Sequence, residues 1–241
     1  MKLKELNIEE RPRERLIAKG SSALGNAELL AILLRTGSGN KNVLEMSHEL
    51  LAAAGSLTEL SAMSIDKMQS IGGIGKNKAA TVTAAFELGR TLAKHGHGMV
   101  FGGYDVGLMG AVAHGVASEG GSVIGVVTEG LNQKGRDIFP CEELICESDL
   151  ATRKTRMIEL ADAFVTMPGG LGTFDEFFVV VSQVKAGELD AKSAILNVGG
   201  YFDPMVEMLD RACETGLNST DWRRDCEVFN APEPLVEWLE G

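Results

Sequence analysis

Residues 163–176 read AFVTMPGGLGTFDE, and this stretch decides the fold. A short apolar run at 163–167 ends in a proline and two glycines, and an amphipathic run begins at Thr173. Such a pattern is typical of a buried strand, a phosphate-binding loop and a helix N-terminus. We therefore predict an α/β domain built around residues 168–176.

A second stretch of the same kind lies at residues 99–110, MVFGGYDVGLMG. Its apolar run also ends in glycines, and a further glycine opens the next helix. Backbone amides at two such loops can bind one nucleotide phosphate. We predict phosphate contacts from the loop glycines and the threonine, which are Gly102, Gly103, Gly107, Gly169, Gly170, Gly172 and Thr173.

The rest of the chain after residue 97 alternates short apolar runs with helical patterns, which predicts a Rossmann-like, doubly wound parallel sheet over residues 97–241. Between residues 128 and 143 no period is visible, and we expect a loop over the sheet. The predicted strands are 99–102, 123–127, 144–146, 163–167, 194–197 and 227–229, and the predicted helices are 108–118, 151–161, 173–184, 204–215 and 232–239.

Residues 1–96 have apolar residues at helical spacing, for example at 27–34, 43–51 and 78–88, and predict a small all-α domain. This segment contains 13 Lys and Arg against 10 Asp and Glu, whereas the remainder contains 10 against 24. The asymmetry indicates either two modules with different partners or two solvated surfaces of different composition.

Residues 71–79, IGGIGKNKA, have the glycine spacing of a helix-hairpin-helix turn. Such a turn presents backbone amides to a DNA phosphate, with nearby lysines adding charge. The DNA contacts expected on this basis are Gly73, Gly75, Lys76 and Lys78. The alternative is that the turn only joins two helices.

Several classes of protein and site are excluded by what the sequence lacks. No apolar run approaches the length needed to cross a bilayer, and the four cysteines have no paired spacing for zinc or disulfides. We expect a cytoplasmic protein with reduced thiols. His114 lies within an apolar helical run and is expected to pack.

The N-terminal third resembles the helical domain of the RadC family. The resemblance covers residues 1–93 and rests on the hairpin, on residues 10–16, ERPRERL, and on residues 22–37, SALGNAELLAILLRTG. In that family a metal-binding domain with an HxH motif follows. Here His95 and His97 form the only HxH and lack the family's downstream ligands, so we predict no metal site.

The remainder resembles the Lonely Guy (LOG) family, on residues 168–176, 107–113 (GLMGAVA), 120–127 (GGSVIGVV) and the pair Arg153-Lys154. The resemblance implies hydrolysis of the N-glycosidic bond of a nucleoside 5′-monophosphate, with Arg153 and Glu176 catalytic and Lys154 binding substrate. It implies no cofactor and a homodimer.

Glu176 follows Thr173 by three residues, so the two side chains share one face of the first helical turn. A carboxylate there complements the helix dipole. It can also stabilise the positive charge that develops on ribose as the glycosidic bond breaks. An arginine fork suits a phosphate or the ribose edge.

This chain departs from the LOG pattern in one respect, because the family's first strand and its glycine/serine loop are absent. The RadC-like helix at 84–95 leads directly into residue 99 instead. In a doubly wound sheet that strand is central. Two other functions therefore stay open: a DNA-binding protein resembling the DprA/Smf family, and a catalytically silent nucleotide-binding module.

Overall fold

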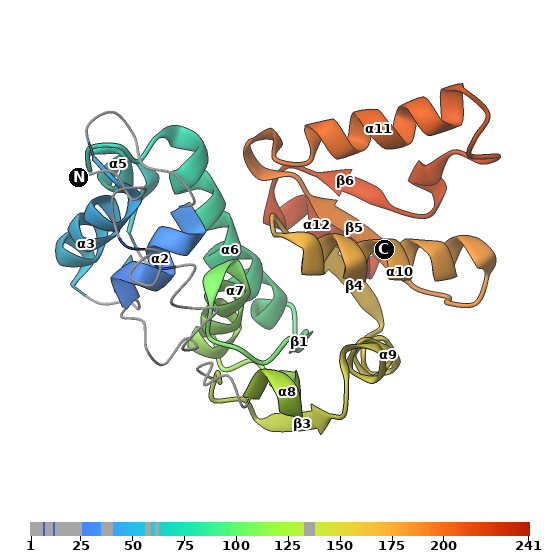
Figure 1. The fold of residues 1–241 in the computed structure, drawn as a ribbon, viewed down its shortest axis with the longest axis horizontal. Helices are drawn as coiled ribbons and strands as arrows, with labels where there is room; N and C mark the ends of the chain where they lie inside the picture. Colours follow the sequence, from blue (N-terminus) through green and yellow to red (C-terminus); the bar gives the residue numbers. More distant parts are fainter. Residues whose placement is uncertain are drawn as a thin grey trace. The chain divides into compact units, whose positions relative to one another are not determined.

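The structure is a computed structural model that describes residues 7, 12, 26–34, 41–55, 59–60, 63–132 and 138–241. It is an α/β protein with parallel sheets and a helical N-terminal region (Figure 1). The chain divides into two compact units, Met1–Arg153 and Lys154–Gly241.

The first unit begins with helices and continues into a three-stranded parallel sheet of order β1-β2-β3. Met99 pairs with Val123, and Val126 pairs with Ile145. The elements are α2 (Asn26–Leu34), α3 (Val43–Ala54), α5 (Ile65–Gln69), α6 (Lys76–Lys94), β1 (Met99–Phe101), α7 (Gly107–Ser118), β2 (Val123–Thr128), α8 (Glu129–Asn132) and β3 (Glu143–Glu147).

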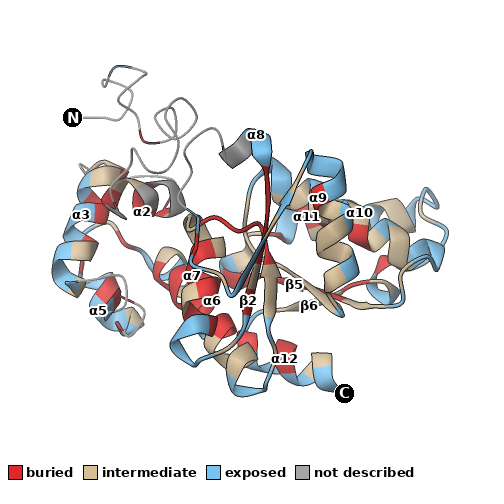
Figure 2. Ribbon diagram, turned by 90° about the horizontal axis from the view of Figure 1, so that it is seen from below, coloured by how far each residue is buried: buried red, intermediate tan, exposed pale blue. Residues whose placement is uncertain are grey.

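Helix α6 packs on α7 through two glycines. A Cβ on Gly89 would lie 2.7 Å from the Val116 nitrogen and 2.9 Å from the Gly115 Cα, so only glycine permits this approach. The facing sides of the two helices are buried (Figure 2). Ala93 of α6 also packs against the core formed by Phe101, Val116 and Phe139. The last helix of the N-terminal region is therefore part of the core that supports β1.

The second unit contains another three-stranded parallel sheet, of order β4-β5-β6. Its core gathers Phe177, Ile195, Phe202 and Trp222. The elements are β4 (Ala163–Thr166), α10 (Leu171–Ala186), β5 (Lys192–Leu196), η4 (Val198–Gly200), α11 (Asp203–Glu214), η5 (Trp222–Arg224), β6 (Glu227–Phe229) and α12 (Pro232–Glu240); α9 (Leu150–Leu160) contains the boundary between the units.

The strands and helices predicted after residue 97 are confirmed to within two residues at nearly every end. One expectation needs correction, and one helix was not predicted. The segment 128–143 is not a continuous loop, because residues 129–132 form α8 and residue 143 already begins β3. Helix α5 was missed because it has only five residues, too few for a visible period.

Both sheets end on a strand with one partner in the described part of the chain. β1 pairs only with β2, and β4 pairs only with β5. Each of these edge strands leads into one of the two glycine loops. The expected absence of a strand beside residues 99–102 stays a prediction, because β3 and β6, the other outer strands of the described sheets, also have one partner each.

Candidate functional site

The first unit has a candidate phosphate site in the loop between β1 and α7. Gly103 and Gly107 have φ values of +75° and +69°, which side chains other than glycine rarely adopt. Val106 precedes α7, and no described side chain caps that end. The amides of the first turn therefore have no partner within the helix and can donate hydrogen bonds to an anion.

Arg153 lies against this loop. Its Nε donates a hydrogen bond of 2.7 Å to the carbonyl of Val126 on β2. A Cβ on Gly102 would clash with the guanidinium and lie 3.0 Å from the Met109 sulfur. The absence of a side chain at Gly102 therefore makes room for the arginine fork.

Local structure explains how Arg153 is placed. Asp149 caps the start of α9 and accepts hydrogen bonds of 2.8 and 2.9 Å from the amides of Ala151 and Thr152. These backbone hydrogen bonds hold the pKa of the Asp149 carboxyl below its usual value. The capped first turn presents Arg153, which is 8% exposed. Among the described residues it is the only buried one that carries a charge.

The second unit has a candidate site of its own in the loop from β4 to α10, with Pro168 and the glycines that follow it. The hydroxyl of Tyr201 donates a hydrogen bond to the carbonyl of Gly169. Asn197, which follows β5, accepts a hydrogen bond of 2.7 Å from the Phe202 amide and donates one of 2.7 Å to the Asp203 carboxylate. The segment after β5 therefore fixes the glycine loop after β4.

Thr173 and Glu176 lie in the first two turns of α10, half-buried. Gly170 precedes the helix, and within the described chain no side chain caps its N-terminus. Asp175 is exposed and forms an ion pair of 2.7 Å with Lys154. Lys154, which was expected to bind substrate, is therefore held by the carboxylate of Asp175, the residue before Glu176 in the sequence.

Each unit brings together its own part of the predicted site. The first holds Gly102, Gly103, Gly107 and Arg153, and the second holds Lys154, Gly169, Gly170, Gly172, Thr173 and Glu176. Sequence reasoning missed Asp149 and Tyr201. The Ser-Asp pair before a helical run was a usable N-cap signal for Asp149. Tyr201 had no comparable local signal.

The helix-hairpin-helix residues lie where α5 turns into α6. Gly73 has a φ of +97°, and Gly75 precedes α6 with open space around its Cβ position. Lys76 is exposed, whereas Lys78 is half-buried and burial lowers its pKa. The glycine turn between two helices is present as predicted, and Lys76 is the more exposed of the two lysines. Contact of these residues with DNA stays a prediction.

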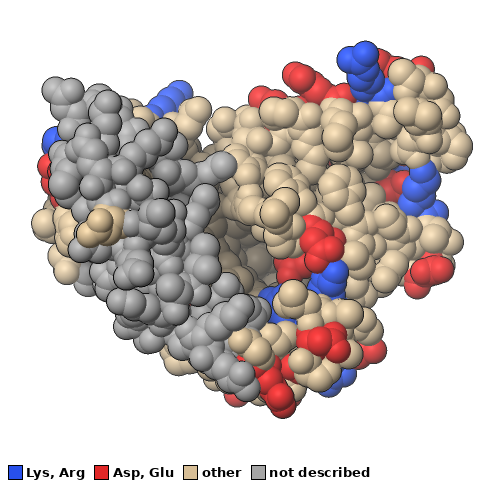
Figure 3. All heavy atoms as spheres, in the orientation of Figure 1, with Lys and Arg blue, Asp and Glu red and all other residues tan. Residues whose placement is uncertain are grey.

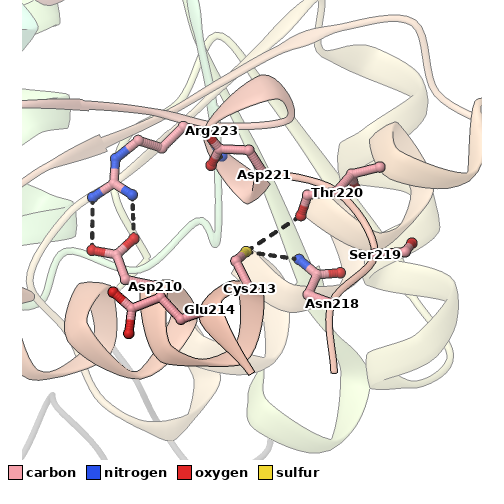
Figure 4. Close-up of a pocket in the computed structure, with 8 residues that line it drawn as sticks. All are labelled: Asp210, Cys213, Glu214, Asn218, Ser219, Thr220, Asp221 and Arg223. Carbon is pink, nitrogen blue, oxygen red and sulfur yellow. Dashed lines mark hydrogen bonds and ion pairs between the residues drawn. The ribbon is translucent and has the colours of Figure 1, made fainter. Parts of the chain in front are cut away.

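A separate hollow lies beside α11 and η5 (Figure 4). Arg223 donates to Asp210, with an Nη2–Oδ2 distance of 3.0 Å, and Glu214 and Asp221 add negative charge. Arg223 is the only cation among the residues that line the hollow, and Asp210 neutralises it. The hollow is therefore a poor site for a phosphate. None of the predicted site residues lines it.

The described residues contain no cluster of side chains able to hold a metal ion. No described helix combines the length and apolar character needed to cross a membrane. On the face drawn in Figure 3, acidic side chains gather over β3 and the start of α9, where Glu142, Glu143 and Asp149 are exposed.

Comparison with known families divides the chain in the same way as its motifs. Residues 3–80 match the family described as UPF0758 N-terminal, which corresponds to the RadC-like module. Residues 109–239 match the family described as possible lysine decarboxylase.

Two curated plant relatives match most of the chain. The first is the cytokinin riboside 5′-monophosphate phosphoribohydrolase LOG of Oryza sativa subsp. japonica, 37% identical over 155 residues. The match takes in 64% of this chain and 63% of the rice protein, so this chain spans less than two thirds of that relative's length. The second is LOG1 of Arabidopsis thaliana, 33% identical over 68% of this chain and 77% of that protein.

Solved structures match at lower identity. The molybdenum cofactor binding protein of Rippkaea orientalis is 17% identical, with a TM-score of 0.49 over 67% of this chain and 86% of that chain. A molybdenum cofactor carrier protein of Chlamydomonas reinhardtii is 21% identical, with a TM-score of 0.49 over 66% and 86%.

Proposed function

Because the chain belongs to the possible lysine decarboxylase family, which includes the LOG-type proteins, we propose that it hydrolyses the N-glycosidic bond of a nucleoside 5′-monophosphate. The products are the free base and ribose 5-phosphate. The name of the rice relative gives a cytokinin riboside 5′-monophosphate as its substrate, and for this chain we propose AMP or an N6-substituted AMP, as the LOG resemblance implies.

Arg153 carries this proposal. Buried arginine is rare in proteins, and Arg153 is held in place by the hydrogen bond from its Nε to the Val126 carbonyl. Arg153 lies against Gly102, at the start of a glycine loop that opens a helix N-terminus. A cation, a glycine loop and a helix dipole together suit a phosphate monoester.

Glu176 supplies the second group that the reaction needs. As the bond between C1′ and the base nitrogen breaks, its electron pair leaves with the base and positive charge develops on the ribose. The carboxylate stabilises that charge, and water adds to C1′. A proton from the water balances the departing base. We assign charge stabilisation and water orientation to Glu176, and phosphate or ribose binding to Arg153, Lys154 and the loop amides.

The test is incubation of the purified protein with AMP and with N6-isopentenyl-AMP, followed by chromatography for free base. Adenosine is the matched control, because it lacks the phosphate that the glycine loops would bind. We expect base from the monophosphates and little from adenosine. No base from any of them would favour a silent nucleotide-binding module, and equal rates with adenosine would remove the role given to the loops. The homodimer stays a prediction, tested by the mass in solution.

The hairpin supports a second candidate function, contact with DNA phosphates through the N-terminal region. Exposed Lys76 and the open space at Gly75 favour it. Contact through the rest of the chain is disfavoured, because residues 97–241 carry 24 Asp and Glu against 10 Lys and Arg, a balance that repels a polyanion.

Lys76→Glu is expected to weaken binding of a short duplex and to reduce the slope of log K against log salt concentration by about 1. Fluorescence anisotropy at several salt concentrations measures both. Lys94→Glu is the matched control, with the same change at the opposite end of α6, roughly 27 Å away. Equal effects from both variants would point to nonspecific charge attraction, and no effect from Lys76→Glu would remove the hairpin from DNA binding.

A further inference from the structure

Asp105 and His114 form a hydrogen-bonded pair that the proposed function does not use. Asp105 lies in the loop between β1 and α7, and His114 lies two turns along α7. The His114 Nε2 is 3.0 Å from Oδ1 and 3.1 Å from Oδ2 of Asp105. A carboxylate only accepts, so Nε2–H donates. His114 was expected simply to pack, but its side chain is 36% exposed and holds a loop residue.

The Asp105 side chain crosses the first turn of α7 to reach His114. It passes over Gly110, where a Cβ would lie 2.6 Å from Oδ1 and 3.1 Å from the Asp105 carbonyl carbon. Glycine at position 110 therefore makes the crossing possible. The hydrogen bond between Asp105 and His114 therefore ties the loop to α7, the helix that follows it.

Phe139 joins the same arrangement from another segment. Its ring packs edge-on against His114, with centroids 4.9 Å apart, and against Phe101 at 5.9 Å. Its backbone amide donates a 3.0 Å hydrogen bond to the carbonyl of Gly103. The ring is 2% exposed. Phe139 therefore holds the glycine end of the loop and supports His114, which holds the other end through Asp105.

We propose that Asp105 and His114 are positioning residues that keep the β1–α7 loop in its phosphate-binding shape. This inference rests on the proposed function, because it assumes that the loop binds the substrate phosphate. Phe139 holds Gly103 in either case, but without the hydrogen bond to His114 we expect Asp105 and Val106 to sample other conformations before binding. The bound shape then costs more to reach, which weakens affinity while the reacting groups stay unchanged.

The test compares His114→Leu, which removes the donor, with His114→Gln, whose side-chain amide can still donate to Asp105. Calorimetric titration with AMP is done in the Glu176→Gln background, where we expect AMP to be hydrolysed too slowly to disturb the measurement. We expect His114→Leu to weaken binding about tenfold, and His114→Gln to recover most of the loss. In the wild-type background, His114→Leu should raise KM, whereas its kcat should stay within about twofold of the parent's value.

A second measurement needs no ligand. Hydrogen exchange at the amides of Tyr104 and Val106 is expected to be faster in His114→Leu than in the parent protein. If His114→Leu fails to fold, Asp105→Ala provides the same test from the loop side. If both single variants and the double variant Asp105→Ala/His114→Leu fold, the double variant should bind AMP no more weakly than either single variant. The same hydrogen bond is lost in all of them.

The outcomes separate the two proposals. Unchanged AMP binding and unchanged exchange in His114→Leu would overturn the positioning role and leave the proposed function intact. Equal losses in the Leu and Gln variants would also overturn it, because the ring and not the hydrogen bond would then matter. If the parent protein binds no AMP, the proposed function fails and the phosphate role of the loop with it.

Discussion

Replacing Glu176 by glutamine is expected to lower kcat for base release by a factor of about 10²–10³ while the protein stays folded. Glutamine keeps the shape of the side chain and removes the negative charge. The charge matters most when the sugar carries its positive charge, so the loss should fall on kcat more than on KM. Steady-state assays with N6-isopentenyl-AMP, with circular dichroism as a check of folding, measure this.

The matched control is Glu188→Gln, which makes the same change beyond the other end of α10 at an exposed position. Its rate should equal that of the parent protein. A Glu176→Gln variant that retains most of the parent's kcat would contradict the role assigned to the carboxylate. It would leave the phosphate-binding role of Arg153 to be tested separately.

Gly89→Ala is expected to destabilise the first unit by about 3 kcal/mol or more. Within a helix, alanine is intrinsically better than glycine by about 1 kcal/mol. Here the added methyl would clash with the Val112 carbonyl and lie 2.7 Å from the Val116 nitrogen. These are backbone atoms of α7 and cannot rotate away, so the helices must separate and the loop at Gly107 moves with α7.

Urea unfolding measures this effect. Far-ultraviolet circular dichroism reports on all helices, whereas both tryptophans, Trp222 and Trp238, lie in the second unit. We expect Gly89→Ala to shift the dichroism transition to lower urea and to affect tryptophan fluorescence less. Gly130→Ala, at an exposed glycine with open space around it, should stay within about 1 kcal/mol of the parent. Equal stability of Gly89→Ala and the parent protein would mean that α6 does not pack closely on α7.

The expected domain boundary at residues 96–97 also depends on this contact. One family matches residues 3–80 and the other matches residues 109–239, whereas the two compact units of the structure meet after Arg153. Helix α6 belongs to the first module by sequence and packs on α7 of the second. Two independent folding domains therefore stay a prediction, and Gly89→Ala tests the coupling between them directly.

The amino-acid sequence by itself determined the strand–loop–helix units at residues 99–110 and 163–176, the helical N-terminal region and the hairpin. These are local features: glycines that permit a positive φ, apolar runs with a period, and residues that start helices act within a few positions of the chain. Only the tertiary structure placed Arg153 on the Val126 carbonyl beside Gly102, Tyr201 on the Gly169 carbonyl, and α6 on α7 through Gly89. Such contacts join residues far apart in the chain. They depend on strand register and helix crossing, which arise from packing the whole core and leave no periodic signal in the sequence.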